Sequence, residues 1–325
     1  MNIQLYFLQT SHLLANESRR YPALERLLSV SQYTQRTTTL QVMLCEAFAV
    51  QKQSDWPLAA INWLGEGGQP DFAYWLQADP AHFVMQRDCF ALAELVALPQ
   101  ACSQSLQDSL NQHFAEDGLQ FRLGQPDAHG HSHWYLRLNA NPEISTTLPE
   151  IALGRDVRPF LPQGVSAMQW NRLLNEVQML LHVHPLNQAR EAEGKPMVNS
   201  VWLSAGGVLP GTPIAGSGTL VGSHPLVKGI SLLAHAPHLD STKNALELFE
   251  NSFINNKKEP IFIVLDDIEA IEESWFEPLL VHLHKRKIKQ LSLHFSVQDQ
   301  VGSFSIRPLN LYKFWRKSKL LQEYF

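Results

Sequence analysis

Apolar runs alternate with stretches of helical spacing at both ends of the chain. The run Ile261 to Leu265 (IFIVL) is continuous, which is typical of a strand buried on both faces of a parallel sheet. The other predicted strands here are Asn2 to Leu8, Val198 to Leu203 and Gln290 to Phe295. Helical spacing predicts helices over Tyr21 to Val30, Leu40 to Ala49, Pro225 to Ala234, Asn244 to Ser252, Trp275 to Lys285 and Leu309 to Tyr324. This alternation predicts an α/β core sheet flanked by helices.

The middle of the chain has a different pattern. Residues 64–71 (LGEGGQPD) form a Gly/Pro-rich break. After it, short strands at Phe83 to Met85 and Trp134 to Leu138 alternate with a helix near Leu92 to Phe114. We therefore predict an inserted, smaller α+β module over residues 69–165, and an α/β core made of residues 1–68 and 166–325.

A further helix is predicted from Ser166 to about His184. Ser166 and Gln169 have the spacing of a capping box, in which each side chain satisfies a free backbone N–H. Pro185 ends this helix, because proline has no N–H to donate and disfavours helix in the residue before it. A short helix is expected over Asn187 to Glu193, with Gly194 as its C-terminal cap.

Composition narrows the class of protein. The chain has 325 residues, 45% hydrophobic and 18% charged, enough for a large core and two domains, or one domain with an insertion. Its net charge of −5 argues against nucleic acid as a partner, because phosphate binding needs a basic field. No stretch approaches the ~20 apolar residues of a membrane-spanning helix, and no basic segment precedes the first apolar run as in a secretory signal. Three widely spaced cysteines indicate no zinc or disulfide framework, so we expect a cytoplasmic protein without a membrane partner.

Polar residues crowd into the block Asn175 to Gly207. Its amides and imidazoles are more numerous than in an ordinary core, while Trp202 beside Gly206 and Gly207 indicates more than a surface segment. The block is therefore the best candidate for a ligand site. The alternative is structural: the amides satisfy backbone groups where a helix meets a strand.

Two aspartates and three histidines are candidate metal ligands. Asp266 and Asp267 follow the IFIVL run, and open α/β sheets usually place functional groups at such strand ends. The pair could hold a divalent ion or could favour the dipole of a following helix. His129, His131 and His133 alternate, so on a strand they would share one face. Neighbours on one strand lie ~6–7 Å apart, which suits a single ion poorly, and a surface loop is the alternative.

Two other segments have weaker chemical signals. The Gly-rich segment Gly206 to Gly222 lacks the lysine that a P-loop places before its final Ser/Thr, so we interpret it as a flexible connection. The segment YKFWRKSKLL (residues 312–321) is basic with interleaved aromatics, and could contact an acidic surface or be a solvated face. No Ser-His-Asp or Cys-His arrangement and no GxSxG motif is visible.

The polar block resembles a known family. Residues 173–207 (LLNEVQMLLHVHPLNQAREAEGKPMVNSVWLSAGG) are similar to the RpfE-type bacterial regulatory family, which is related to the cofactor-independent, archaeal-type phosphoglycerate mutases. Other family-like stretches are Leu76 to Asp88 (LQADPAHFVMQRD), His133 to Leu138 (HWYLRL), and GRDV and LPQG within residues 154–164. The resemblance implies an alkaline-phosphatase-like α/β core with an inserted α+β module.

The mutases carry a His-Pro-x-Asn…Arg…Gly…Asn run before a Gly-x-Gly turn. Its counterparts here are His184, Pro185, Asn187, Arg190, Gly194, Asn199, Gly206 and Gly207. His224 to Ala234 (HPLVKGISLLA) resembles the mutases' Lys-Gly helix and places Lys228 in their pattern. We therefore expect a pocket for an anion or a phosphorylated small molecule, with Arg190 clamping an acidic group. The predicted ligand-binding residues are His184, Asn187, Arg190, Asn199 and Lys228.

The catalytic residues of the mutases lack counterparts. Those enzymes hold two divalent metals and use a Ser or Thr nucleophile. Their first strand ends in aspartate, where this chain has Gln9 to His12, and their nucleophile follows a glycine-rich approach, where this chain has Thr37 to Leu40. The expected histidine after Asp266 and Asp267 is missing, and the last metal strand has only a separated His294 and Asp299 in place of an Asp-His pair. Without metals a threonine hydroxyl is a poor nucleophile.

We therefore expect a catalytically degenerate, regulatory or phospho-metabolite-binding protein with no cofactor and no catalytic residues. The alternative is an active metal-dependent phosphomutase or phosphohydrolase, with Asp266 and Asp267 as ligands of a divalent metal such as Mn or Zn. A third hypothesis is an interaction protein that binds a protein partner through its aromatic C-terminal helix.

Overall fold

The IFIVL run forms strand β12 (Ile261–Leu265) in the computed structural model, and all its side chains are buried. It pairs in parallel with β1 (Asn2–Phe7) on one side and β10 (Thr219–Val221) on the other. The predicted buried parallel strand is thus confirmed. The structure describes residues 1–7, 19–69, 71–87, 89–127, 129–211, 213–240, 244–250, 259–265, 271–297 and 299–325.

These strands belong to a seven-stranded sheet with the order β11–β10–β12–β1–β13–β14–β2. Its other strands are β11 (His238–Leu239), β13 (Gln290–Val297), β14 (Gln300–Ile306) and β2 (Gln32–Thr37). The strands from β11 to β13 run parallel, and β14 and β2 are added antiparallel at one edge.

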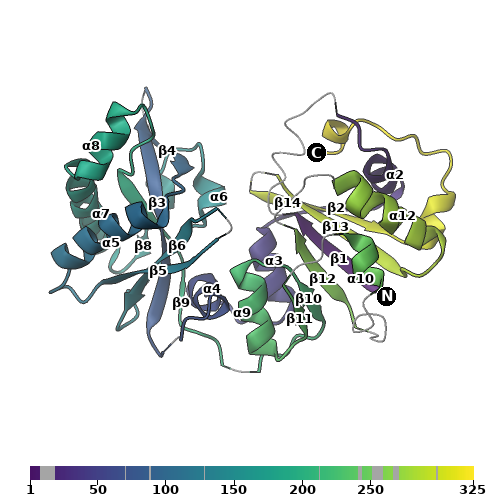
Figure 1. The fold of residues 1–325 in the computed structure, drawn as a ribbon, viewed down its shortest axis with the longest axis horizontal. Helices are drawn as coiled ribbons and strands as arrows, with labels where there is room; N and C mark the ends of the chain where they lie inside the picture. Colours follow the sequence, from purple (N-terminus) through teal and green to yellow (C-terminus); the bar gives the residue numbers. More distant parts are fainter. Residues whose placement is uncertain are drawn as a thin grey trace. The chain divides into compact units, whose positions relative to one another are not determined.

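Helices cover both faces of this sheet, which confirms the predicted α/β class (Figure 1). On one face lie α2 (Pro22–Val30), α10 (Ala245–Glu250) and α12 (Glu277–His284), the last preceded by the π-helical turn η2 (Glu272–Phe276). On the other face lie α3 (Leu40–Ala47) and α9 (Pro225–Ala234). Because neighbouring strand residues alternate, Leu5 of β1 joins the core with α2, whereas Tyr6 lies against α3 and α9.

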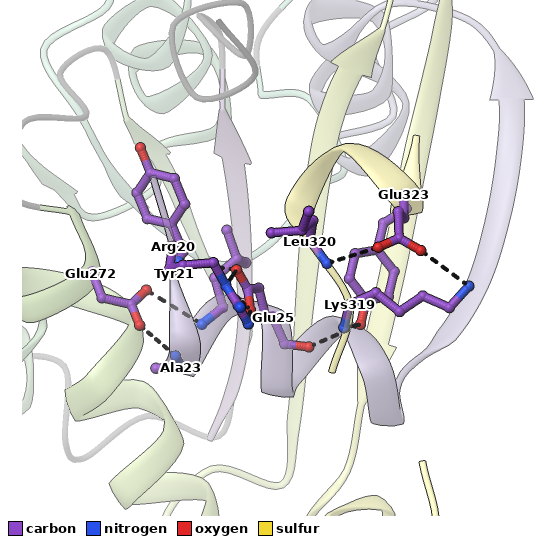
Figure 2. Close-up of polar contacts among 10 residues, drawn as sticks. Arg20, Tyr21, Ala23, Glu25, Glu272, Lys319, Leu320 and Glu323 are labelled. Atoms are coloured by element: carbon purple, nitrogen blue, oxygen red, sulfur yellow. Dashed lines mark hydrogen bonds and ion pairs between the residues drawn. The ribbon is translucent and has the colours of Figure 1, made fainter. Parts of the chain in front are cut away.

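Two buried glutamates hold the start of α2 (Figure 2). Glu272 of η2 accepts hydrogen bonds from two backbone N–H groups of the first helical turn, which have no acceptor within the helix. Glu25 accepts from the Arg20 guanidinium and from the N–H of Tyr21. Burial raises the pKa of Glu272. Burial also acts to raise the pKa of Glu25, but the hydrogen bonds from Arg20 and Tyr21 outweigh it and lower that pKa.

The C-terminal segment is not the helix predicted over Leu309 to Tyr324. It forms two short 3-10 turns, η3 (Pro308–Tyr312) and η4 (Leu321–Tyr324), joined by a mostly exposed basic stretch. Leu311 and Leu321 are buried in the same core as α2. Since the residues between these anchors stay in solvent, no apolar stripe of helical spacing forms, and the helix prediction was wrong.

The chain divides into two units, which we call the main unit (Met1–Val50 with Thr212–Phe325) and the inserted unit (Gln51–Gly211). The inserted unit is built on an antiparallel sheet in which β3 pairs with β4, β6 and β9, and β5 pairs with β6. The bounds are β3 (Tyr74–Met85), β4 (Phe90–Leu95), β5 (Gln120–Pro126), β6 (Ser132–Leu138) and β9 (Ser200–Gly207). A separate pair joins β7 (Ile144–Ser145) and β8 (Gln163–Gly164).

Helices also cover both faces of the inserted sheet. One face packs against α5 (Gln100–His113) and α7 (Ala167–His182), and the other against α4 (Leu58–Gly65). Shorter helical segments are α6 (Pro149–Ala152), η1 (Arg158–Phe160) and α8 (Pro185–Ala192). No helix in the described ranges is long and apolar enough to cross a membrane.

The inserted unit extends beyond the predicted limits at residues 69 and 165. β9 pairs along β3, and α4 and α7 pack on the same sheet, so segments on both sides of the predicted module join it. Part of the predicted helix Leu92 to Phe114 forms β4 instead, and α5 begins at Gln100. Ser166 is the N-cap of α7, but its side chain makes no capping bond, since its backbone (φ −93°, ψ 10°) is not extended as capping requires.

The variant Glu272→Ala is expected to destabilise the main unit by about 1–3 kcal/mol, because two N–H groups at the start of α2 would lose their buried acceptor. Urea unfolding followed by circular dichroism measures this. The control is Glu273→Ala, since Glu273 is the exposed neighbour. Equal midpoints for the two variants would contradict the capping role.

Candidate functional site

Asn187 is fully buried at the junction of α7, α8 and the loop before β9. Its amide nitrogen donates to the carbonyl oxygens of Leu181 and Val198, both at 2.7 Å. Its Oδ1 accepts from the N–H of Val198 at 2.8 Å. The side chain therefore ties the end of α7 to the chain that leads into β9, which is the structural role considered as the alternative for the polar block.

Asn199 and Arg190 also bind backbone groups. The Asn199 side chain accepts from the N–H of Phe83 and donates to its carbonyl oxygen, both at 2.8 Å. It thereby extends the pairing of β9 with β3 to the residue before the start of β9. Arg190 Nε donates to the carbonyl oxygen of Pro196 at 2.7 Å. Arg190 is only part-buried, so part of its guanidinium remains at the surface, and its ligand role stays a prediction.

Two histidines use the same local geometry in the two units. His184 is the N-cap of α8, where its Nδ1 accepts from the N–H of Leu186 at 3.1 Å. His224 is the N-cap of α9, where its Nδ1 accepts from the N–H of Leu226 at 3.1 Å. In each case a proline follows at the first helical position. The Nε2 of His184 lies 3.1 Å from Ser109 Oγ, and burial lowers the pKa of His184.

Lys228 lies at the carboxyl edge of β10 and β11 in the main unit. Its Nζ is 3.0 Å from Oδ1 of Asp240, which follows β11, and the two side chains are 37% and 75% exposed. The hydrogen bond from Lys228 lowers the pKa of Asp240. Gly222 follows β10 with φ +145°, where a Cβ would lie 2.8 Å from the carbonyl oxygen of Val264, so the close turn into α9 requires glycine. Open α/β sheets usually bind ligands at this edge.

His294 of β13 is part of the sheet interior. Its Nδ1 lies 2.8 Å from Ser303 Oγ and its Nε2 lies 3.1 Å from Gln4 Oε1. The ring stacks on Tyr6 with 4.7 Å between centroids. Burial lowers the pKa of His294 to about 4, so the ring is neutral at pH 7. With both nitrogens engaged, this histidine braces three neighbouring strands.

Metal ligands are not brought together in the part of the chain that the structure describes. Among those residues, no group of three or more His, Cys, Asp or Glu side chains is arranged to hold an ion. Asp266 and Asp267 lie outside the described residues. The rings of His129 and His131 are 6.2 Å apart near the surface, while His133 turns to a carboxylate. A small cavity of about 10 Å³ beside Tyr6 and His224 has room for one water at most.

A carboxylate–imidazole pair in the inserted unit, made of a buried glutamate and a partly exposed histidine, is absent from the sequence predictions. Glu66 Oε1, just after α4, lies 2.6 Å from His133 Nδ1 on β6, and the Glu66 side chain is only 5% exposed. Asp79 of β3 interacts electrostatically with the same ring. Burial raises the pKa of Asp79 to about 7, although His133 acts to lower it. Burial acts to lower the pKa of His133, but the hydrogen bond to Glu66 and the charges of Glu66, Asp79 and Asp127 together outweigh it and raise that pKa.

Aromatic side chains pack against one another on the α4 face of the inserted sheet, near this pair. Trp63 stacks on Trp75 with 4.8 Å between ring centroids and meets Tyr135 edge-on at 5.4 Å. The indole nitrogens of Trp63 and Trp75 are buried without a hydrogen-bond partner among the described residues. Burial, together with the charge of Glu66, raises the pKa of Tyr135. Because burial raises its pKa to about 7, Asp79 can hold a proton near neutral pH.

Only one member of this cluster had a signal in the sequence. Asp79 stands in the apolar run of β3, and a carboxylate there is seldom buried without a partner. Glu66 belongs to the Gly-rich break, where a charged residue is unremarkable. His133 stood out only as one of three alternating histidines. Their meeting depends on the packing of α4 against the sheet, which is a long-range contact.

Comparison with known proteins shows a distant relation to phosphoglycerate mutases over part of the chain. No family model matches the chain. The 2,3-bisphosphoglycerate-independent phosphoglycerate mutase of Methanosarcina barkeri is 30% identical over 101 residues, which cover 30% of this chain and 25% of that enzyme. The probable enzyme of the same name from Geobacter sulfurreducens is 25% identical over 185 residues, 55% of this chain and 45% of that protein. The match thus spans less than half the length of these relatives.

Two solved structures are also similar to the chain. The cofactor-independent phosphoglycerate mutase of Thermoplasma acidophilum is 15% identical, with a TM-score of 0.41 over 94% of this chain and 89% of that one. A protein of Pyrococcus horikoshii is 13% identical, with a TM-score of 0.49 over 94% of this chain and 87% of that one. The resemblance to the RpfE-type family stays a prediction.

The variant Asn187→Ala is expected to destabilise the inserted unit by about 2–4 kcal/mol, because it leaves buried backbone groups of Leu181 and Val198 without partners. Urea unfolding followed by tryptophan fluorescence measures the loss. Gln188→Ala is the control, since Gln188 is the exposed neighbour on α8. A variant Asn187→Ala as stable as the control would show that Asn187 does not brace the unit.

The inserted unit is expected to lose stability as pH rises from about 4 to about 7. The folded unit binds the Asp79 proton over this range and the unfolded chain does not. The raised pKa of His133 acts in the same direction only above about pH 6.5, where the unfolded histidine loses its proton first. The expected decrease in unfolding free energy is on the order of 1–3 kcal/mol, measured by urea unfolding at several pH values.

The variant Asp79→Asn should flatten this pH dependence, and Asp117→Asn, on an exposed residue of the same unit, should leave it unchanged. The same pH dependence in both variants would rule out Asp79 as its source.

Proposed function

We propose that the chain is a non-catalytic relative of phosphoglycerate mutases that binds a phosphorylated small molecule at the carboxyl edge of β10 and β11. The observation that carries this proposal is the ion pair between Lys228 and Asp240. It supports the proposal because an anionic oxygen is accommodated 3.0 Å from an ammonium group at the edge where open α/β sheets bind ligands.

The surroundings of Lys228 favour a dianionic ligand over a neutral one. The N–H groups of Leu226 and Val227 are already bonded to His224, so Lys228 is the donor that the start of α9 offers. The positive end of the α9 dipole lies within a turn of it, which adds to the attraction for an anion. Asp240 is 75% exposed, so a phosphate group can displace it at little cost, since exposed ion pairs contribute little stability.

Two described residues support the absence of catalysis. Thr39, in the segment where the resemblance places the nucleophile, is 4% exposed, and its hydroxyl oxygen caps α3 by accepting from the N–H of Val42 at 3.3 Å. His294 is neutral and has both nitrogens engaged within the sheet. Side chains held in this way are poorly placed to attack a phosphorus atom or bind a metal. The regulatory role and the alkaline-phosphatase-like ancestry belong to this same proposal.

An activity assay distinguishes this proposal from the alternative, an active enzyme in which Asp266 and Asp267 bind Mn or Zn. Purified protein is incubated with 3-phosphoglycerate and Mn²⁺, Zn²⁺ or Mg²⁺. We expect neither isomerisation to 2-phosphoglycerate nor release of phosphate. Turnover with any of the three metals would overturn the non-catalytic part of the proposal.

The variant Lys228→Met tests the binding part. We expect 3-phosphoglycerate at millimolar concentration to raise the melting temperature of the unmodified protein and to lose this effect in Lys228→Met. Lys285→Met, which removes an exposed cation just after α12, should keep the full shift. The proposed site would be excluded by equal shifts in both variants, or by none in the unmodified protein.

A further inference from the structure

A second candidate site lies on the main unit, where the C-terminal segment runs beside α2 and β2. It is an open hollow of about 810 Å³, within the usual range of small-molecule sites. Its floor includes Phe304 of β14, and Tyr33 of β2 packs on that ring with 4.8 Å between centroids. The C-terminal turn beside it is held by Tyr324, whose hydroxyl donates to the carbonyl oxygen of Glu25.

Four cationic side chains line this hollow, and three of them contact a carbonyl or carboxylate oxygen of the main unit. Lys313 donates to the carbonyl oxygen of Val30 at 3.3 Å, and Arg316 donates to that of Ser29 at 3.4 Å. Lys319 lies 3.9 Å from Glu323, the acidic residue of the lining (Figure 2). Lys317 is exposed beside them. The lining thus carries a clear excess of positive charge on a chain whose net charge is −5.

Aromatic rings stand among these cations. Trp315 is 66% exposed and Tyr33 is 44% exposed, although both line the hollow. Large rings left partly in water offer flat faces on which another aromatic ring can stack. Gln32 adds an exposed amide that can both donate and accept hydrogen bonds.

We propose that this hollow binds a nucleoside polyphosphate, with the base stacked on Trp315 and the phosphates held by Lys313, Arg316 and Lys317. Cations alone would fit any anion, and exposed rings alone would fit any apolar group. The two together, in a hollow sized for one small molecule, favour a ligand that has an aromatic ring joined to several negative charges. An acidic peptide would satisfy the cations but would leave the ring faces unused. This site is independent of the one at Lys228.

The test uses the full chain and the fluorescent nucleotide mant-ADP, with binding followed by fluorescence anisotropy. Trp315→Ala is expected to weaken binding about tenfold, through loss of stacking. Lys317→Glu is expected to weaken it by a similar factor, and more strongly at low ionic strength. Lys285→Glu, the same charge change on the exposed residue that follows α12, should bind as the unmodified protein does.

Competition identifies the ligand class. We expect unlabelled ADP to displace the probe at a concentration at least tenfold lower than pyrophosphate, and 3-phosphoglycerate not to displace it. The proposal is overturned if no saturable binding is seen, or if pyrophosphate competes as well as ADP. Displacement by a poly-glutamate peptide with no effect of Trp315→Ala would equally overturn it, in favour of an acidic protein partner. Failure of this test leaves the Lys228 proposal unaffected, because different variants report on the two sites.

Discussion

The parallel pairing of β1 with both β12 and β13 is the contact on which the rest of the structure depends. β1 comes from the first residues of the chain, whereas its partners lie beyond residue 260. Because β1 and its partners are far apart in the sequence, the chain between them must leave the sheet after β1 and return to it for β12 and β13. Because loop-closure entropy grows only slowly with length, a complete unit of residues 51–211 can occupy the path between α3 and β10 without a large penalty. The strands of the inserted unit need only bring its first and last residues close together.

The inserted unit repeats this requirement on a smaller scale. β3 pairs with β9, and the chain returns to β3 through the irregular turn after α8. Backbone groups in such a turn have neither helix nor strand partners, and buried ones must be satisfied by side chains. Asn187 and Asn199 supply those partners. Much of the polar crowding in this block therefore has a structural cause, and the density of amides alone does not indicate a ligand.

Local patterns and long-range contacts differ in how far they could be predicted. The burial of β12, the extent of α2 and α9, and the cap at Gly194 follow from local spacing and backbone preference, and the structure agrees. The limits of the inserted unit depend on which strand pairs with β9. The prediction of a C-terminal helix was wrong because the burial of Leu311 and Leu321 in the core sets the path of that segment. The same distinction holds for sites: Lys228 was visible within one helix, whereas Glu66 and His133 meet only after α4 packs on its sheet.

The repeated histidine–proline caps change what the sequence resemblance can support. His184 and His224 open helices in different units with the same bond from Nδ1 to an N–H two residues on. A motif that recurs for the same local reason indicates a helix start, and its match to an enzyme family can reflect folding alone. Lys228 is different, because the cap at His224 does not use its side chain, which reaches an exposed carboxylate at the sheet edge instead. A cation whose side chain takes no part in the helix cap, placed where α/β sheets bind ligands, carries more functional information than the whole polar block Asn175 to Gly207.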